Sequence, residues 1–187
     1  MLGLPQETEI IVPLTKTPWQ AGRIGKRERQ DWYQGCALAK ELLDRLKAEG
    51  KLAKIFILSA FQAKGQATER ALYREALQEL GVGPGDIETI HHGLETIGQV
   101  EYLDTFAKAG YVIHLISVET QHDRVRLLTR EMGFLHYKAC GIARPSDRRT
   151  DRILDILFPA LDRIHARKIF LKVFLPWLRR RRARGIL

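Results

Sequence analysis

The chain has little of what would cross-link it or anchor it in a membrane: two cysteines and no long apolar run among 187 residues. Cys36 and Cys140 lie far apart without a Cys-x-x-Cys pattern, which excludes a disulfide scaffold and indicates reduced cytosolic thiols. No apolar run reaches about 18 residues, so no helix is expected to span a bilayer. The opening MLGLPQETEI lacks the basic and apolar regions of a signal peptide. We therefore expect a cytoplasmic protein.

Acidic side chains are absent from residues 163–187, which contain nine of the 31 lysines and arginines. The remaining 22 cations balance the 22 acids of residues 1–162, so the formal net charge of +9 belongs entirely to the tail. We predict an α/β domain over 1–162 and a basic amphipathic helix with an Arg-rich tail over 163–187. A body without net charge argues against nucleic acid as the partner.

The tail combines an apolar stretch, KIFLKVFLPWL, with the arginine run that follows it. As a helix the stretch would measure roughly 16 Å, about half the hydrocarbon core of a bilayer. One interpretation is that 168–184 lies on an anionic membrane surface, which would place the protein peripherally at the inner face of the membrane. The alternative is that the apolar stretch packs on the domain or on a second subunit.

Apolar patterns along the body alternate between continuous runs and helical spacing. The runs predict strands at 9–14, 54–60, 86–90, 111–118 and 134–139. The helical spacing predicts helices at 28–48, 67–80, 96–109, 121–131 and 147–167. This order is typical of an α/β fold, and we predict a three-layer Rossmann-like architecture in which helices cover both faces of a mainly parallel five-stranded sheet. Ligands of such sheets bind at the carboxyl ends of the strands.

The first loop at that edge, 15–27, contains two glycines and four cations. Backbone N–H groups of such a loop could hold an anion, with Thr15 and Lys16 as candidate ligands. The spacing of its glycines fits neither a P-loop nor a dinucleotide fingerprint. The alternative is a solvated basic surface loop.

The second loop, 59–68, carries Ser59 and Gln66 as candidate ligand-binding residues and leads into Glu69. Thr68 is a candidate helix cap, which would place Glu69 in the first helical turn, where the helix dipole favours a carboxylate. The sharper interpretation is that Glu69 points at a ligand hydroxyl or amine as an acid/base or orienting group. Both interpretations stay open.

Two further helix starts supply the other candidates. Thr96 and Gln99 have the spacing of a capping box, which would explain them without a ligand, although both could also shape a pocket. His122 stands at the next helix start with Arg124 and Arg126 behind it, an arrangement that favours an anion or, alternatively, leaves three solvated side chains.

No catalytic triad, HExxH motif or zinc-spaced set is present, so the residues do not support metal binding, and they do not identify a cofactor. A small molecule with a phosphate or carboxylate fits this polar edge better than a cation does. Hydrolysis, group transfer and binding alone all fit the same residues.

Three segments resemble one family: TERALYREALQELGVGPGDI (68–87), ETIGQV (95–100) and ISVETQHDRVR (116–126). They are similar, in order and spacing, to motifs of the YdcF/SanA/ElyC-like proteins. The resemblance covers roughly 9–142 and implies a Rossmann-like fold of largely unsettled biochemistry. One member is associated with S-adenosylmethionine, and others with envelope barrier functions and lipid-carrier metabolism.

Carried over by position, the resemblance nominates Glu69, Thr96, Gln99 and His122. The chain departs from the family at PLTKT (13–17), where a Gly-rich turn is usual, and at Val125, where an arginine is usual. We expect a YdcF-like protein that binds a small anionic or nucleotide-like ligand, with Glu69 and His122 as catalytic groups if there is a reaction. The alternative is a non-catalytic membrane-peripheral protein localised by its tail.

Overall fold

The structure is a computed structural model. It describes residues 5, 7–14, 19–20, 23–24, 26–60, 67–93 and 96–139, and the single residues 160, 176 and 180. The predictions for Thr15, Lys16 and Gln66 lie outside the described residues, as do the final helix, the tail and the side chain of Arg124. The division at residue 162 therefore stays a prediction.

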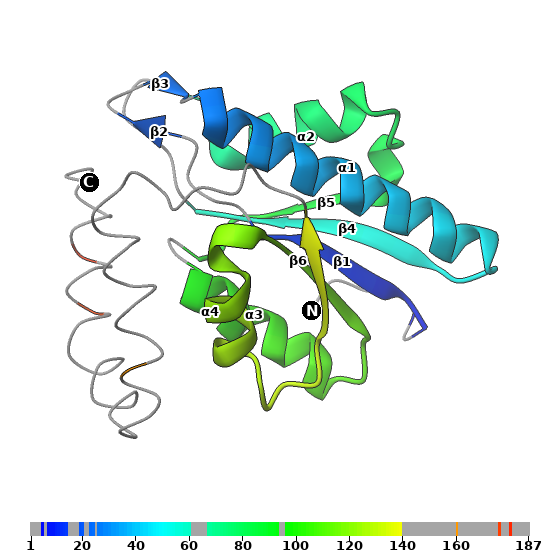
Figure 1. The fold of residues 1–187 in the computed structure, drawn as a ribbon. Helices are drawn as coiled ribbons and strands as arrows, with labels where there is room; N and C mark the ends of the chain where they lie inside the picture. Colours follow the sequence, from blue (N-terminus) through cyan, green and yellow to red (C-terminus); the bar gives the residue numbers. More distant parts are fainter. Residues whose placement is uncertain are drawn as a thin grey trace.

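Five strands form one fully parallel sheet in the order β5-β4-β1-β6-β7 (Figure 1). Their bounds are Glu9–Pro13 (β1), Ala53–Leu58 (β4), Ile87–Ile90 (β5), Ile113–Val118 (β6) and Leu135–Ala139 (β7). Four of them lie within the predicted strands, and β4 begins one residue before the predicted range of 54–60 and stops two residues short of its end. In order of appearance along the chain the strands stand 3-2-1-4-5, the order of a Rossmann-like sheet, so the predicted α/β class is confirmed.

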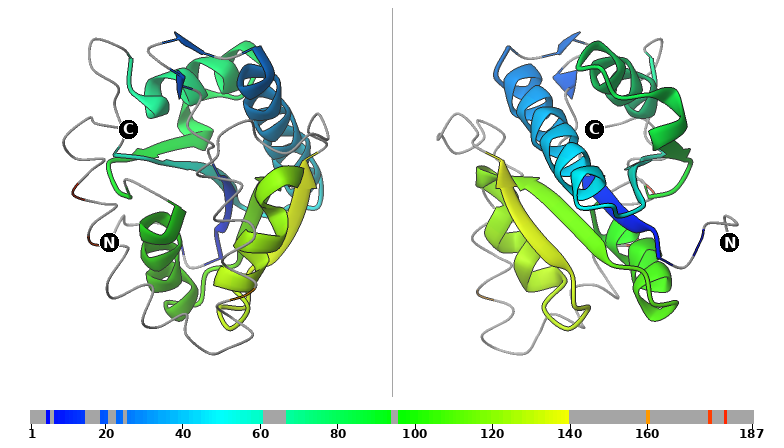
Figure 2. Two further views of the ribbon diagram at one scale, coloured as in Figure 1. Left: turned by 60° about the vertical axis from the view of Figure 1, so that its left-hand side comes forward. Right: turned by 90° about the vertical axis from the view of Figure 1, so that its right-hand side faces the viewer.

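Helices cover both faces of the sheet (Figures 1 and 2). The first two, α1 (Lys26–Ala48) and α2 (Glu69–Glu79), cover one face, and α3 (Thr96–Lys108) and α4 (Glu119–Leu128) cover the other. None of the helices in the described ranges is long and apolar enough to cross a bilayer. The two helices that follow β5, α3 and α4, thus cover the face opposite to α1 and α2.

The hydrophobic core is split by the sheet into two layers, because successive strand side chains point to opposite faces. Ile11 of β1 packs under α1 and α2, whereas its neighbour Ile10 packs under α3 and α4. All six residues of β6 are buried. Such a strand favours apolar side chains on both faces, and four of its six residues are apolar, His114 and Ser117 being the exceptions.

One feature was not predicted, a short antiparallel hairpin within the expected loop 15–27. It pairs β2 (Trp19–Gln20) with β3 (Arg23–Ile24). Two-residue strands produce no periodicity over a useful window, so the pattern that predicted the long strands could not find them. The hairpin stands between β1 and α1, at the carboxyl end of the sheet.

Candidate functional site

The chain reverses its direction of travel across the sheet between β1 and β6. From β1 it proceeds to β4 and β5 on one side, and it then returns past β1 to form β6 and β7 on the other. In open parallel sheets the crevice outside the carboxyl ends at this switch point is where ligands bind. Polar side chains follow β4 and β6, the two strands that flank β1.

At the end of β4, Ser59 and Glu69 form a buried pair. The Ser59 hydroxyl donates to Glu69 Oε2 at 2.6 Å, and the two side chains are 1% and 2% exposed. Thr68 caps α2 by accepting from the Ala71 N–H at 3.2 Å, as predicted. Glu69 thus starts the helix, but the helix dipole alone would not require its burial. Its carboxylate lies beside the end of β4, where it can accept hydrogen bonds.

Gln99 reaches the same strand end from the opposite face. Its Nε2 donates to the Leu58 carbonyl at 2.6 Å, and the side chain is 3% exposed. The predicted capping box is wrong, because this amide turns to β4 and its Oε1 has no hydrogen-bond partner among the described residues. Thr96 is the first residue of α3, one position later than a cap.

The close approach of Gln99 depends on Gly93, which sequence reasoning missed. A Cβ on Gly93 would stand 2.6 Å from Gln99 Cγ and 2.8 Å from its backbone N. Gly93 also has a φ of +79° and accepts a hydrogen bond from the Ala60 N–H. A lone glycine after His91 and His92 was the only signal in the sequence, and it indicated a turn without indicating this contact.

At the end of β6, Ser117 lies 2.9 Å from His122, measured from Oγ to Nδ1. His122 stands in the first turn of α4, as predicted, and Ser117 is buried. Burial lowers the pKa of His122 below its ordinary value of 6.5, helped by the charges of Arg126 and Lys138 and opposed by Asp123. At neutral pH the imidazole is therefore a neutral base held in place by a hydroxyl.

Sequence reasoning also missed His136 of β7. Its ring lies 6.4 Å from the ring of His122 between centroids, and its Nε2 lies 3.0 Å from the Thr129 hydroxyl. Burial lowers the pKa of His136 as well, with further contributions from His122 and Arg126. No local motif connects the two histidines, since only the packing of α4 on β6 and β7 brings them together.

The two lowered histidine pKa values predict a stability that falls in mild acid. Each group binds a proton more readily in the unfolded chain, so its contribution is present above pH 6.5 and is lost as pH falls through the lower folded pKa. Urea unfolding between pH 7.5 and about 5 should show this loss, and His122→Gln/His136→Gln should flatten it. His91→Gln, at an exposed position, is the matched control. An unchanged slope in the double variant would contradict the prediction.

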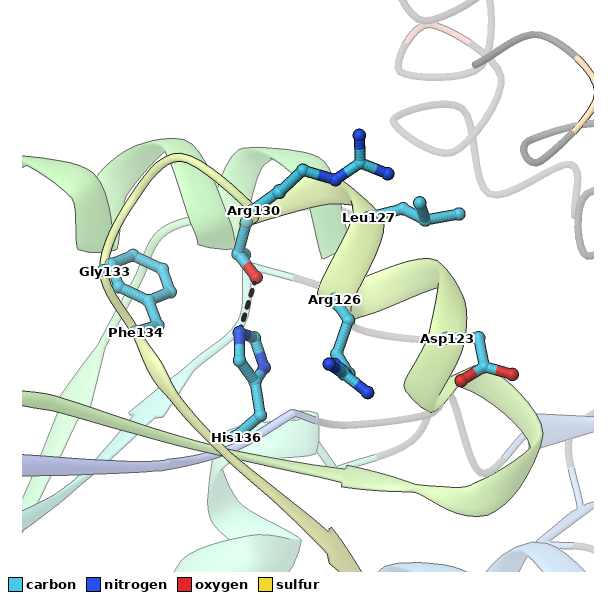
Figure 3. A pocket seen from close by; sticks show the side chains of 8 residues that line it. Asp123, Arg126, Leu127, Arg130, Gly133, Phe134 and His136 are labelled. Carbon is cyan, nitrogen blue, oxygen red and sulfur yellow. Dashed lines mark hydrogen bonds between the residues drawn. The ribbon is translucent and has the colours of Figure 1, made fainter. Parts of the chain in front are cut away.

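The structure does not bring all the nominated residues together. Glu69 and Gln99 meet at β4, whereas His122 stands beside β6, on the far side of the central strand β1. Arg126 borders a separate cavity of about 540 Å³ next to β7 (Figure 3). The site at the carboxyl ends of the strands thus consists of two polar pairs, Ser59–Glu69 and Ser117–His122. They lie about two strand spacings, or roughly 10 Å, apart.

Neither a metal centre nor a reactive thiol is formed by the described residues. They contain no cluster of three or more His, Cys, Asp or Glu side chains that could hold a metal ion. Cys36 is fully buried in the layer under α1, and burial raises the pKa of its thiol. Among the described side chains, the groups available for proton transfer at this edge are Glu69 and His122.

No protein-family model, curated protein or solved structure matches this chain. The resemblance to the YdcF-like proteins accordingly stays a prediction. Arguments about function rest on the geometry of the two polar pairs and of the switch point between them.

Proposed function

We propose that this protein binds a small anionic or nucleotide-like ligand at the carboxyl ends of the strands, across the switch point between β1 and β6. The observation that supports it is a polar contact at the end of each flanking strand, the buried pair of Ser59 with Glu69 and the part-buried pair of Ser117 with His122. Burying such groups costs free energy, so a fold keeps them where they serve a site. Their position is where a Rossmann-like sheet takes its ligands.

The two pairs suit different ends of one ligand. Glu69 and the Oε1 of Gln99 are acceptors, which suit ligand hydroxyls or an amine. In the tautomer in which Ser117 donates to Nδ1, His122 carries its proton on Nε2 and can donate it to a phosphate or carboxylate. S-adenosylmethionine and phosphorylated or lipid-linked molecules, the ligands that the resemblance implies, combine both kinds of group.

The arrangement would also support a reaction on such a ligand. A carboxylate and a neutral imidazole on opposite sides of β1 supply two groups that can accept a proton from the ligand or return it. Thr96, half-buried at the start of α3, would add a hydroxyl on the Gln99 side. Binding is the function proposed, and Glu69 and His122 are its candidate acid/base groups.

Thermal unfolding with a small panel tests the proposal: S-adenosylmethionine, a nucleoside diphosphate and pyrophosphate. A ligand at about 100 times its Kd should stabilise the wild type by about 2.7 kcal/mol. Glu69→Gln should weaken binding of the hydroxyl- or amine-bearing compounds about tenfold, through loss of a charge-assisted hydrogen bond. Glu75→Gln, exposed on the same helix, is the matched control.

Two results would count against the proposal. One is a panel in which no compound stabilises the wild type more than it stabilises Glu69→Gln. The other is equal weakening by Glu69→Gln and Glu75→Gln, which would trace the effect to the charge of α2. His122→Gln should weaken the anionic compounds, pyrophosphate included, because pyrophosphate reaches only the Ser117–His122 side.

A further inference from the structure

A second hollow lies away from the proposed site, where α4 and the turn after it pack beside β7 (Figure 3). Its volume of about 540 Å³ is in the range of small-molecule pockets. None of Ser59, Glu69, Gln99, Ser117 and His122 borders it. Among the described residues, those that border it are Asp123, Arg126, Leu127, Thr129, Arg130, Gly133, Phe134 and His136.

The border of this hollow is cationic on one part and apolar on another. Arg126 from α4 and Arg130 from the following turn bring two exposed guanidinium groups, and Asp123 is the one carboxylate among the described residues at the border. Phe134 and Leu127 supply the apolar part, and Phe134 is buried. Arginine forks are suited to phosphate and carboxylate oxygens.

The hydrogen bonds of His136, which borders the hollow, indicate which of its ring nitrogens carries the proton. The Thr129 hydroxyl donates to the Val125 carbonyl at 2.9 Å, so its oxygen accepts from His136 Nε2–H. The other nitrogen, Nδ1, is buried and has no hydrogen-bond partner among the described residues. A proton on Nδ1 would place a positive charge near Arg126, and its N–H would find no hydrogen-bond acceptor among the described residues. The ring is therefore neutral in the absence of a bound anion.

We propose that this hollow is a second binding site, for a free small organic anion whose phosphate or carboxylate meets Arg126 and Arg130 and whose apolar body lies against Phe134 and Leu127. The site is independent of the function proposed above, since it uses none of its residues. An anion there offsets the cationic field at His136. Binding is therefore coupled to uptake of a proton by that ring.

Calorimetric titration of the full chain with phenyl phosphate tests the site, because this probe joins a phosphate to an aromatic ring. Arg126→Gln/Arg130→Gln should weaken binding about tenfold or more, through lost charge-assisted hydrogen bonds. Arg74→Gln, which removes an exposed charge from α2 on the opposite face, should bind as the wild type does. Inorganic phosphate should bind more weakly than phenyl phosphate.

Two further measurements complete the test. His122→Gln, which should weaken anions bound at the carboxyl ends of the strands, should leave phenyl phosphate affinity unchanged, and this result separates the two sites. Imidazole NMR should show the pKa of His136 rising when phenyl phosphate is bound. Equal affinity in the wild type and the double variant would overturn the proposal, and so would equal loss in Arg74→Gln. Arg126→Gln alone gives the same readout should the double variant not fold.

Discussion

Gly93→Ala is expected to destabilise the protein by about 3 kcal/mol or more. Two costs add at this position. The backbone φ of +79° is in the left-handed region, which costs an alanine roughly 1–2 kcal/mol. The new Cβ would also stand 2.6 Å from Gln99 Cγ and 2.8 Å from the Gln99 backbone N, so α3 itself would have to move. Urea unfolding measures the total.

Gly50→Ala is the matched control for this prediction. Gly50 has a nearly equal φ of +77°, but a Cβ there meets nothing within 4 Å. It should lose only the backbone part, about 1–2 kcal/mol. Equal destabilisation of the two variants would show that the packing of Gly93 on Gln99 contributes nothing. Because a displaced Gln99 loses its bond to the Leu58 carbonyl, Gly93→Ala should also weaken ligand binding at the sheet edge, and Gly50→Ala should not.

Glu9→Ala is expected to cost about 3 kcal/mol, from a part-buried network at the amino end of the sheet in which the histidine itself is buried. Glu9 Oε2 lies 2.5 Å from His114 Nε2, and its Oε1 lies 3.0 Å from Lys51 Nζ. His114 is 3% exposed, and its Nδ1 lies 3.0 Å from the Tyr137 hydroxyl. The substitution leaves the His114 N–H without an acceptor in a place where water does not reach.

Glu88→Ala controls for loss of a carboxylate as such. Glu88 pairs with Lys54 at 2.9 Å, but both side chains are about a third exposed, so the pair should contribute only about 0–1 kcal/mol. A loss as large as that in Glu9→Ala would assign the effect to net charge. The comparison is made by urea unfolding at pH 7.

The free energy of unfolding at acid pH should also depend on the contacts of Glu9 with His114 and Lys51. Burial on its own would raise the pKa of Glu9, but the hydrogen bonds from Lys51 and His114 outweigh it and hold the pKa below 4.5. A lowered carboxylate pKa contributes stability above pH 4.5 that is lost as pH falls through the folded value. Below pH 4.5 the wild type should therefore lose stability more steeply than Glu9→Ala.

The regular elements of this fold were predictable because each has a pattern of its own. KIFILSA is apolar without interruption, which fits β4 with helices on both sides, and Gly50 and Gly81 stop α1 and α2 at a positive φ. The order of the strands was not predictable from these patterns. For example, the sequence of β6, IHLISV, does not indicate that this strand pairs with β1 rather than with β5.

Several residues of the candidate site could be nominated from the sequence, but which of them lie together in the fold could not. Glu69 and His122 were singled out because each stands in the first turn of a helix that follows a strand. Gln99 was found, but its direction was wrong, since its spacing fits a capping box equally well and only the missing side chain of Gly93 opens the way to β4. The sequence did not indicate that His136 lies near His122, because the two rings are brought together only by the packing of α4 against β7.

The central position of β1 has a consequence for the nascent chain. One edge of β1 pairs with β4, but the other waits for β6, and Ile10 must find Ile113, 103 residues later. At about 5–20 residues per second, the interval during synthesis is on the order of 5 to 20 s. Until β6 is made, β1, joined by β4 and then β5 as they are synthesised, presents its bare backbone edge and the uncovered face that includes Ile10 and Phe56. Such an edge is a template for pairing with another chain. The ribosome-bound intermediate is therefore the species most exposed to aggregation, and the arrival of β6 ends that exposure.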